Sequence, residues 1–141
     1  MKLGGERGAV QNRIIDYSKV IGWNYLSQDE ALRLRGGGTG LVLKEIFVNK
    51  VQELNPEFMD NLHAEELIKK LEKIPPNLEG NLTAWEYLKG MKTVFDPQQK
   101  RELNVRLIDA DDINKNSYHV TDEFSFTNGT NTIKSRYCIS D

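Results

Sequence analysis

Two carboxylates are the side chains of this sequence whose chemistry is most open to interpretation. Glu6 lies at the start of the first helical pattern, and Asp141 ends the last alternating pattern. Acids hold hard metal ions when several of them come together. Taken singly, Glu6 fits a helix-start acid that interacts with the helix dipole, and Asp141 fits a strand end without a partner. Spacing and composition do not bring the two acids together, and they favour these plain interpretations.

Five other polar residues are interpreted as structural or surface groups. Asp109, Asp111 and Asp112 lack the Gly and the closing Glu of a calcium loop, so a turn with solvated acids at a strand end is favoured. His63 and His119 have no Cys or His at ligand spacing. Both histidines are therefore expected on the surface.

A glycine run at residues 36–40 lies just before a helical pattern, where free backbone N–H groups favour an anion. It is not a Walker loop, because Lys44 comes too late and no clear strand leads into it. A mobile loop is the favoured interpretation. Phosphate contact by Arg33 and Arg35 is the alternative.

The composition is that of an ordinary protein of one compact domain. The 141 residues are 38% hydrophobic, and the formal net charge is −2. Cys138 is the one cysteine, and it fits a reduced thiol in a cytoplasmic protein better than a nucleophile. No stretch is long and apolar enough to span a membrane. The mildly acidic balance gives no general affinity for phosphates, so contact with nucleic acid must come from basic patches or bound metal.

Helical periodicity dominates the first part of the chain. The helical patterns cover residues 6–21, 41–54 and 62–71. Ser27 lies ahead of Asp29 and Glu30 like the cap of a further helix. A shorter helix that ends at Gly90 has Asn81 or Thr83 as its candidate cap.

The period then becomes alternating, which is typical of strands. The alternating patterns cover residues 103–108, 118–126 and 133–139, and a brief strand is expected at 23–26. Asn128-Gly129 favours a tight hairpin. The sequence thus predicts one α+β domain over residues 1–141, with helices to about residue 90 and an antiparallel meander from about residue 91. Because the last strand stops at Asp141 in mid-run, the chain is expected to be truncated.

Several stretches, in order, resemble the first domain of the R subunits of type I restriction enzymes. They are ERGAVQNRII (6–15), IGWNYL (21–26), LRLRG (32–36), LNP (54–56), NVRLID (104–109) and NSYHVTDEF (116–124). Each stretch is a weak signal alone, but together they span nearly the whole chain.

The resemblance implies a nuclease core of the restriction-endonuclease-like kind, a mixed sheet flanked by helices. It carries a metal-binding Asp on one strand and a Glu-x-Lys on the next. In such a site carboxylates hold Mg²⁺, which polarises the scissile phosphate, and the lysine orients or activates water. RYCISD (136–141) is similar to the run that reaches this Asp. Asp141 is therefore the candidate catalytic and metal ligand, with Glu6 as an accessory acid.

The departures from the family pattern bear on activity. No Glu-x-Lys follows Asp141 in this sequence, so the fragment itself is expected to be inactive. The resemblance implies that the full subunit uses ATP to translocate double-stranded DNA and binds the methyltransferase and specificity subunits. Two other functions stay open. One is a non-catalytic docking module, and the other, which the acidic balance disfavours, is a free-standing nucleic-acid binder.

Overall fold

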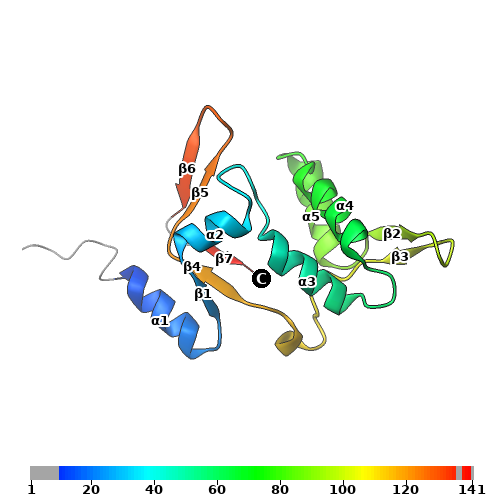
Figure 1. Cartoon of the computed structure of the whole chain (residues 1–141), viewed down its shortest axis with the longest axis horizontal. Coiled ribbons are helices and arrows are strands. Elements are labelled where there is room, and N and C mark those ends of the chain that lie inside the picture. Colours follow the sequence, from blue (N-terminus) through cyan, green and yellow to red (C-terminus); the bar gives the residue numbers. More distant parts are fainter. Residues whose placement is uncertain (1–9, 136–137, 141) are drawn as a thin grey trace, which may run out of the picture. The chain divides into compact units, whose positions relative to one another are not determined.

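The computed structural model describes residues 10–135 and 138–140 (Figure 1). The chain divides into two compact units. The terminal unit joins Met1–Leu43 with Ser117–Asp141, and the central unit is Lys44–Asn116. The sequence prediction of a single domain therefore stays open to experiment.

The terminal unit is built around a small mixed sheet. Strand β4 (His119–Thr121) lies between β1 (Asn24–Leu26) and β7 (Cys138–Ser140). It runs parallel to β1, with Tyr25 opposite Val120, and antiparallel to β7. The remaining elements of the unit are α1 (Asn12–Val20), α2 (Gln28–Leu34), β5 (Phe124–Thr127) and β6 (Thr132–Ser135), of which β5 and β6 form an antiparallel hairpin.

Local signals set the ends of the first two helices. After α1, Gly22 adopts a positive φ of 92°, and its N–H donates to the carbonyl of Lys19. That left-handed conformation suits glycine at a helix end. At the start of α2, the hydroxyl of Ser27 accepts from the N–H of Glu30 at 3.2 Å. Both ends are where the sequence predicts them.

The central unit contains three helices and one hairpin. They are α3 (Lys44–Leu54), α4 (Asn61–Glu72), α5 (Leu78–Leu88), β2 (Thr93–Asp96) and β3 (Arg101–Asn104), followed by a short 3-10 helix at Ile113–Lys115. The side chains of Asp60 and Asn77 each accept a backbone N–H bond at 2.8 Å and cap α4 and α5. Capping by such residues satisfies N–H groups that a helix leaves free.

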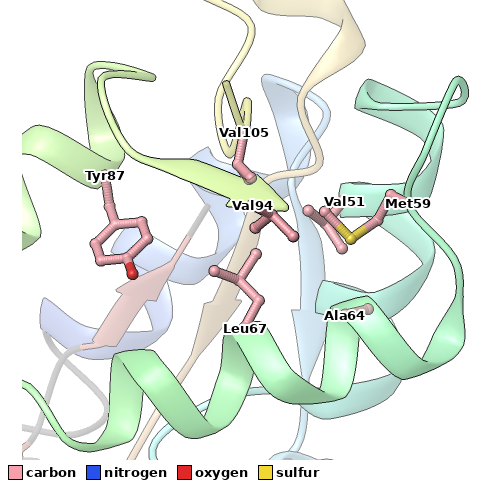
Figure 2. Packing of buried hydrophobic residues seen from close by; sticks show 7 residues of the cluster. All are labelled: Val51, Met59, Ala64, Leu67, Tyr87, Val94 and Val105. Carbon is pink, nitrogen blue, oxygen red and sulfur yellow. The ribbon is translucent and has the colours of Figure 1, made fainter. Parts of the chain in front are cut away.

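The core of the central unit is an apolar cluster that its three α-helices, strand β2 and two loop residues supply (Figure 2). Leu67 of α4 points toward Val94 of β2, and Val51 of α3 lies near Met59. The full set is Val51, Met59, Ala64, Leu67, Tyr87, Val94 and Val105.

A buried amide adds a polar link between α3 and the chain after β3. Asn55 donates to the carbonyls of Val51 and Arg106 and accepts from the N–H of Arg106, each at 2.8 Å. Three bonds from one buried side chain fix the position of the segment that follows α3.

The structure confirms the α+β class and corrects several boundaries. The strand expected at 118–126 is two strands, because the chain bends at Asp122 between β4 and β5. The pairing of β1 with β4 is parallel, so the strands do not form a purely antiparallel meander. Among the described elements, none of the helices has the length and apolar character needed to cross a membrane.

Two further corrections concern α5 and the strand before β3. Helix α5 is capped by Asn77, whereas Thr83 lies inside the helix and donates to the carbonyl of Glu79. Strand β2, at Thr93–Asp96, has no counterpart among the predicted strands. Its four residues are too few for the alternation to stand out in the sequence.

Candidate functional site

The two predicted site acids, Asp141 and Glu6, lie outside the described residues. The neighbouring strand that leads to Asp141 is described. In the pairing of β7 with β4, Ser140 is opposite His119 and Cys138 is opposite Thr121. The residue before Asp141 is thus held at the His119 end of β4, the central strand of its sheet.

The segment that follows Glu6 is held at the other end of the same strand. Gln11, five residues after Glu6, is buried, and its side-chain amide donates to the carbonyl of Asp122, just past β4. The Gln11 anchor and Ser140 therefore lie at opposite ends of β4. Because neither acid is among the described residues, the roles predicted for Asp141 and Glu6 need separate tests.

His119 was expected on the surface and is buried, with 8% of its area exposed. Its Nδ1 atom has no hydrogen-bond partner among the described residues. Burial lowers the pKa of His119, and the backbone of Ser117 opposes this in part. The lowered pKa favours the neutral form of the imidazole, which can accept a proton or bind a metal ion.

Thr121 shares the face of β4 on which His119 lies, since residues two apart in a strand point to the same side. Its hydroxyl is also buried and has no hydrogen-bond partner in the described part of the chain. Sequence reasoning missed this polar face. It treated the strand as half-exposed, but β4 is central and both of its faces are covered.

Arg35 holds the end of the glycine run through a hydrogen bond that the sequence did not predict. The Arg35 guanidinium donates to the carbonyls of Gly40 at 2.8 Å and Ser125 at 2.7 Å. It also lies 3.9 Å from the centroid of the Phe124 ring. With 2% of its area exposed, Arg35 supports the loop from inside and is not positioned to contact a phosphate.

The acidic turn near residue 109 is held together by hydrogen bonds to a buried carboxylate. Asp109 is buried, contrary to the expectation of solvated acids, and accepts from the N–H groups of Asp111 and Asp112 at 3.1 and 2.9 Å. The hydrogen bond from the Asp112 backbone is the main cause that lowers the pKa of Asp109, with Lys115 and Arg106 adding attraction. These contacts explain the turn without a metal ion.

His63 has a structural role at the start of α4. It is partly buried, and its Nδ1 lies 2.7 Å from Oδ1 of Asp60, the cap of α4. The backbone N–H of His63 is the main cause that lowers the pKa of Asp60. The surface position expected for His63 is therefore only partly right.

No group of three or more His, Cys, Asp or Glu side chains that could hold a metal ion occurs within residues 10–135 and 138–140. A groove of about 530 Å³ lies between α3 and α4 in the central unit. Its lining mixes Lys44 and Lys69 with Glu45, Glu65 and Glu72, so it favours neither anions nor cations strongly. The described residues thus contain no complete magnesium site.

A family model for the N terminus of the type I restriction enzyme R protein matches residues 5–137. The chain belongs to this family. Comparison with curated proteins and with solved structures found no match.

The terminal unit contains the two segments that lead to the acids predicted to be catalytic from the family resemblance. One leads from Gln11 back to Glu6, and the other leads from β7 to Asp141. The family match ends at residue 137 and does not itself include Asp141.

Proposed function

We propose that this chain is the N-terminal nuclease part of the DNA-cleaving subunit of a type I restriction-modification system. The full-length protein hydrolyses phosphodiester bonds of double-stranded DNA with Mg²⁺. The family match over residues 5–137 is the observation that carries the proposal.

Asp141 is the proposed metal ligand of this nuclease. Support comes from β7, because its pairing with the buried central strand β4 holds the residue before Asp141 in a fixed register. Catalytic groups on a strand of the scaffold are positioned more exactly than groups on loops. Glu6 is the proposed accessory acid. Bound Mg²⁺ would polarise the scissile phosphate and help to generate hydroxide.

The 141 residues are proposed to be inactive alone. They include no Glu-x-Lys after Asp141 to complete the site. In this proposal, ATP hydrolysis and DNA translocation belong to other parts of the R subunit. The methyltransferase and specificity subunits are its partners in the cytoplasm, and they bring the enzyme to its DNA site.

The test uses the full-length R subunit assembled with its methyltransferase and specificity subunits. With plasmid DNA, ATP and Mg²⁺, Asp141→Asn is expected to abolish cleavage, because the amide replaces the charge that holds the metal ion. ATP hydrolysis should stay at the wild-type rate, since this proposal assigns it to another part of the R subunit. Asp16→Asn, an exposed acid on α1, is the matched control and should cleave normally. Cleavage by Asp141→Asn at the wild-type rate would show that Asp141 is not a metal ligand of the nuclease.

Glu6 is tested separately in the same assembly. Glu6→Gln is expected to slow cleavage less than Asp141→Asn does, as befits an accessory acid. A cleavage rate that stays unchanged over a range of Mg²⁺ concentrations would show that Glu6 has no role as an accessory acid.

A docking module is the second candidate function. The exposed apolar face of helix α5 favours it, because large apolar patches mark interaction surfaces. The same assay distinguishes the two functions. A docking module predicts that every acid substitution in this region leaves cleavage unchanged, provided the complex still assembles.

A further inference from the structure

The hairpin of β2 and β3 carries a local excess of basic side chains. Residues 91–106, which contain the hairpin, include four basic and two acidic residues, although the formal net charge of the whole chain is −2. The basic residues are Lys92, Lys100, Arg101 and Arg106, and the acidic ones are Asp96 and Glu102. A mildly acidic chain needs a patch of this kind to attract a polyanion.

Nearby carboxylates neutralise the basic residues at the base of the hairpin. The Lys92 ammonium lies 2.7 Å from the Glu86 carboxylate. The Arg106 guanidinium lies 3.7 Å from the Asp109 carboxylate. These two cations already have partners within the central unit, so the search for a binding surface turns to the cations at the turn.

Lys100 and Arg101 lie at the turn, which extends away from the helices of the central unit (Figure 1). Both are exposed, and neither makes an ion pair with another described residue. Glu102 points to the opposite face of β3 from Arg101, because successive residues of a strand alternate. Asp96 is buried and accepts from the N–H of Gln98 at 2.9 Å. The turn therefore presents two positive charges to solvent.

The backbone of Lys100 has a conformation that does not favour lysine. Its φ is 52°, and no other residue than glycine has a positive φ in the described part of the chain. Glycine and asparagine adopt such angles at a lower cost. Formation of the turn alone would favour one of these two residues. The lysine indicates that its side chain serves a purpose other than folding.

The side chain of Gln99 orients the Arg101 guanidinium. Nε and Nη2 of Arg101 both donate to Oε1 of Gln99, at 3.0 and 2.7 Å. The amide is neutral, so the positive charge remains. An oriented guanidinium loses less conformational freedom when its other N–H groups bind a phosphate.

The composition of the turn favours nucleic acid over a protein partner. Residues 97–101 are Pro-Gln-Gln-Lys-Arg and include no large apolar side chain. A protein interface is normally built around an apolar centre. Binding of single strands depends on aromatic side chains on which bases stack, and the turn has none. Phosphates of a duplex need only such exposed cations and amides.

We propose that the β2–β3 turn binds the phosphate backbone of double-stranded DNA, without regard to sequence, through Lys100 and Arg101. The choice of DNA rests on the proposed function. The contact itself belongs to the central unit and is separate from the acids proposed for cleavage. It holds DNA on the R subunit, while sequence recognition stays with the specificity subunit.

The test measures binding of the 141-residue chain to a labelled duplex of roughly 20 base pairs, two helical turns, by fluorescence anisotropy without Mg²⁺. Lys100→Gln and Arg101→Gln should each weaken binding roughly five- to tenfold at about 0.1 M salt. Each should also reduce the slope of log K against log salt by about 0.9. Lys70→Gln removes the same charge from an exposed position of α4 and should bind as the wild type does.

Lys100→Gly separates the side chain from the folding of the turn. Glycine adopts a positive φ without strain, so this variant should unfold at the same temperature as the wild type or a higher one. Its binding to DNA should still fall as much as that of Lys100→Gln. Wild-type binding by Lys100→Gly would show that Lys100 serves the turn alone and would overturn the proposal.

Other outcomes of the same assay also count against the proposal. A wild type that does not bind duplex at about 50 mM salt, or an equal loss in Lys70→Gln, would overturn it. Competition by poly-glutamate as strong, per charge, as that by unlabelled duplex would assign the turn to acidic proteins. Because no Mg²⁺ is present and no cleavage is measured, failure here is distinct from failure of the nuclease proposal at Asp141.

Discussion

Asp109 shows how a single buried carboxylate can make the stability of the central unit depend on pH. The N–H groups of Asp112 and Asp111 bind its ionised form, and these bonds lower its pKa from the ordinary value of 3.8. A carboxyl group whose pKa is lower in the folded chain binds protons more weakly there than when unfolded. Its ionisation therefore favours folding.

The sign of this effect gives a testable pH dependence. The contribution of Asp109 is complete above its unfolded pKa, about 4, and is lost as the pH falls through the lower folded value. Asp109→Asn is expected to lower the free energy of unfolding at pH 7, and the difference from wild type should shrink below about pH 4. Urea denaturation at several pH values measures it. Asp111→Asn, at an exposed position of the same turn, is the control. A difference that stays constant to pH 3 would contradict the assignment.

Residue burial was the part of the site that the sequence predicted least well. Arg35, Asp109 and His119 are polar and were expected to meet solvent, yet all three are buried. Arg35 is buried because the carbonyl of Ser125, 90 residues away, lies beside it. Periodicity describes neighbours within about one turn or strand, so it cannot predict partners at that distance. The roles of Asp141 and Glu6 came from the family resemblance and stay predictions.

At the scale of elements, the loop after α2 depends on having no side chain at Gly40. A Cβ atom there would lie 1.9 Å from the backbone oxygen of Arg35. Backbone cannot move aside as a flexible side chain does, so the loop and its bond to the Arg35 guanidinium must shift. Gly40→Ala is expected to destabilise the folded chain by about 3 kcal/mol, the upper range for overpacking.

A second glycine of the loop provides the control. A Cβ atom at Gly38 would meet only Cγ2 of Thr127, at 3.2 Å. That side chain can yield, so Gly38→Ala should cost clearly less in thermal denaturation than Gly40→Ala. Equal losses of stability in the two variants would contradict the idea that the Arg35 backbone makes Gly40 the more sensitive position.

The elements that the sequence predicted well are those with local signals at their ends. Ser27 caps α2 and Gly22 ends α1, because hydrogen bonds within a few residues decide both positions. Strand β1 was also expected, but its parallel pairing with β4 was not. Pairing direction is set by contacts between distant segments, which alternation does not encode.

For the whole molecule, the division into two units predicts how a core defect spreads. Leu67 is nearly fully buried in the core of the central unit. Leu67→Ala is expected to destabilise that unit by roughly 2–5 kcal/mol, the cost of lost contacts and a cavity. Hydrogen exchange should then quicken at amides of α3 and α4 while the amides of β1 and β4 keep their protection. Uniform loss of protection would instead support the single domain predicted from the sequence.

The parallel pairing of β1 with β4 also has a consequence for protein synthesis. Roughly 90 residues separate the two strands, and the whole central unit lies between them. The central unit can fold as soon as it leaves the ribosome, whereas β1 has to wait for β4. At ordinary translation speeds this delay is roughly 5–20 s. During that time the backbone of β1 is open to pairing with other chains, so this strand is the part of its sheet that a chaperone would protect.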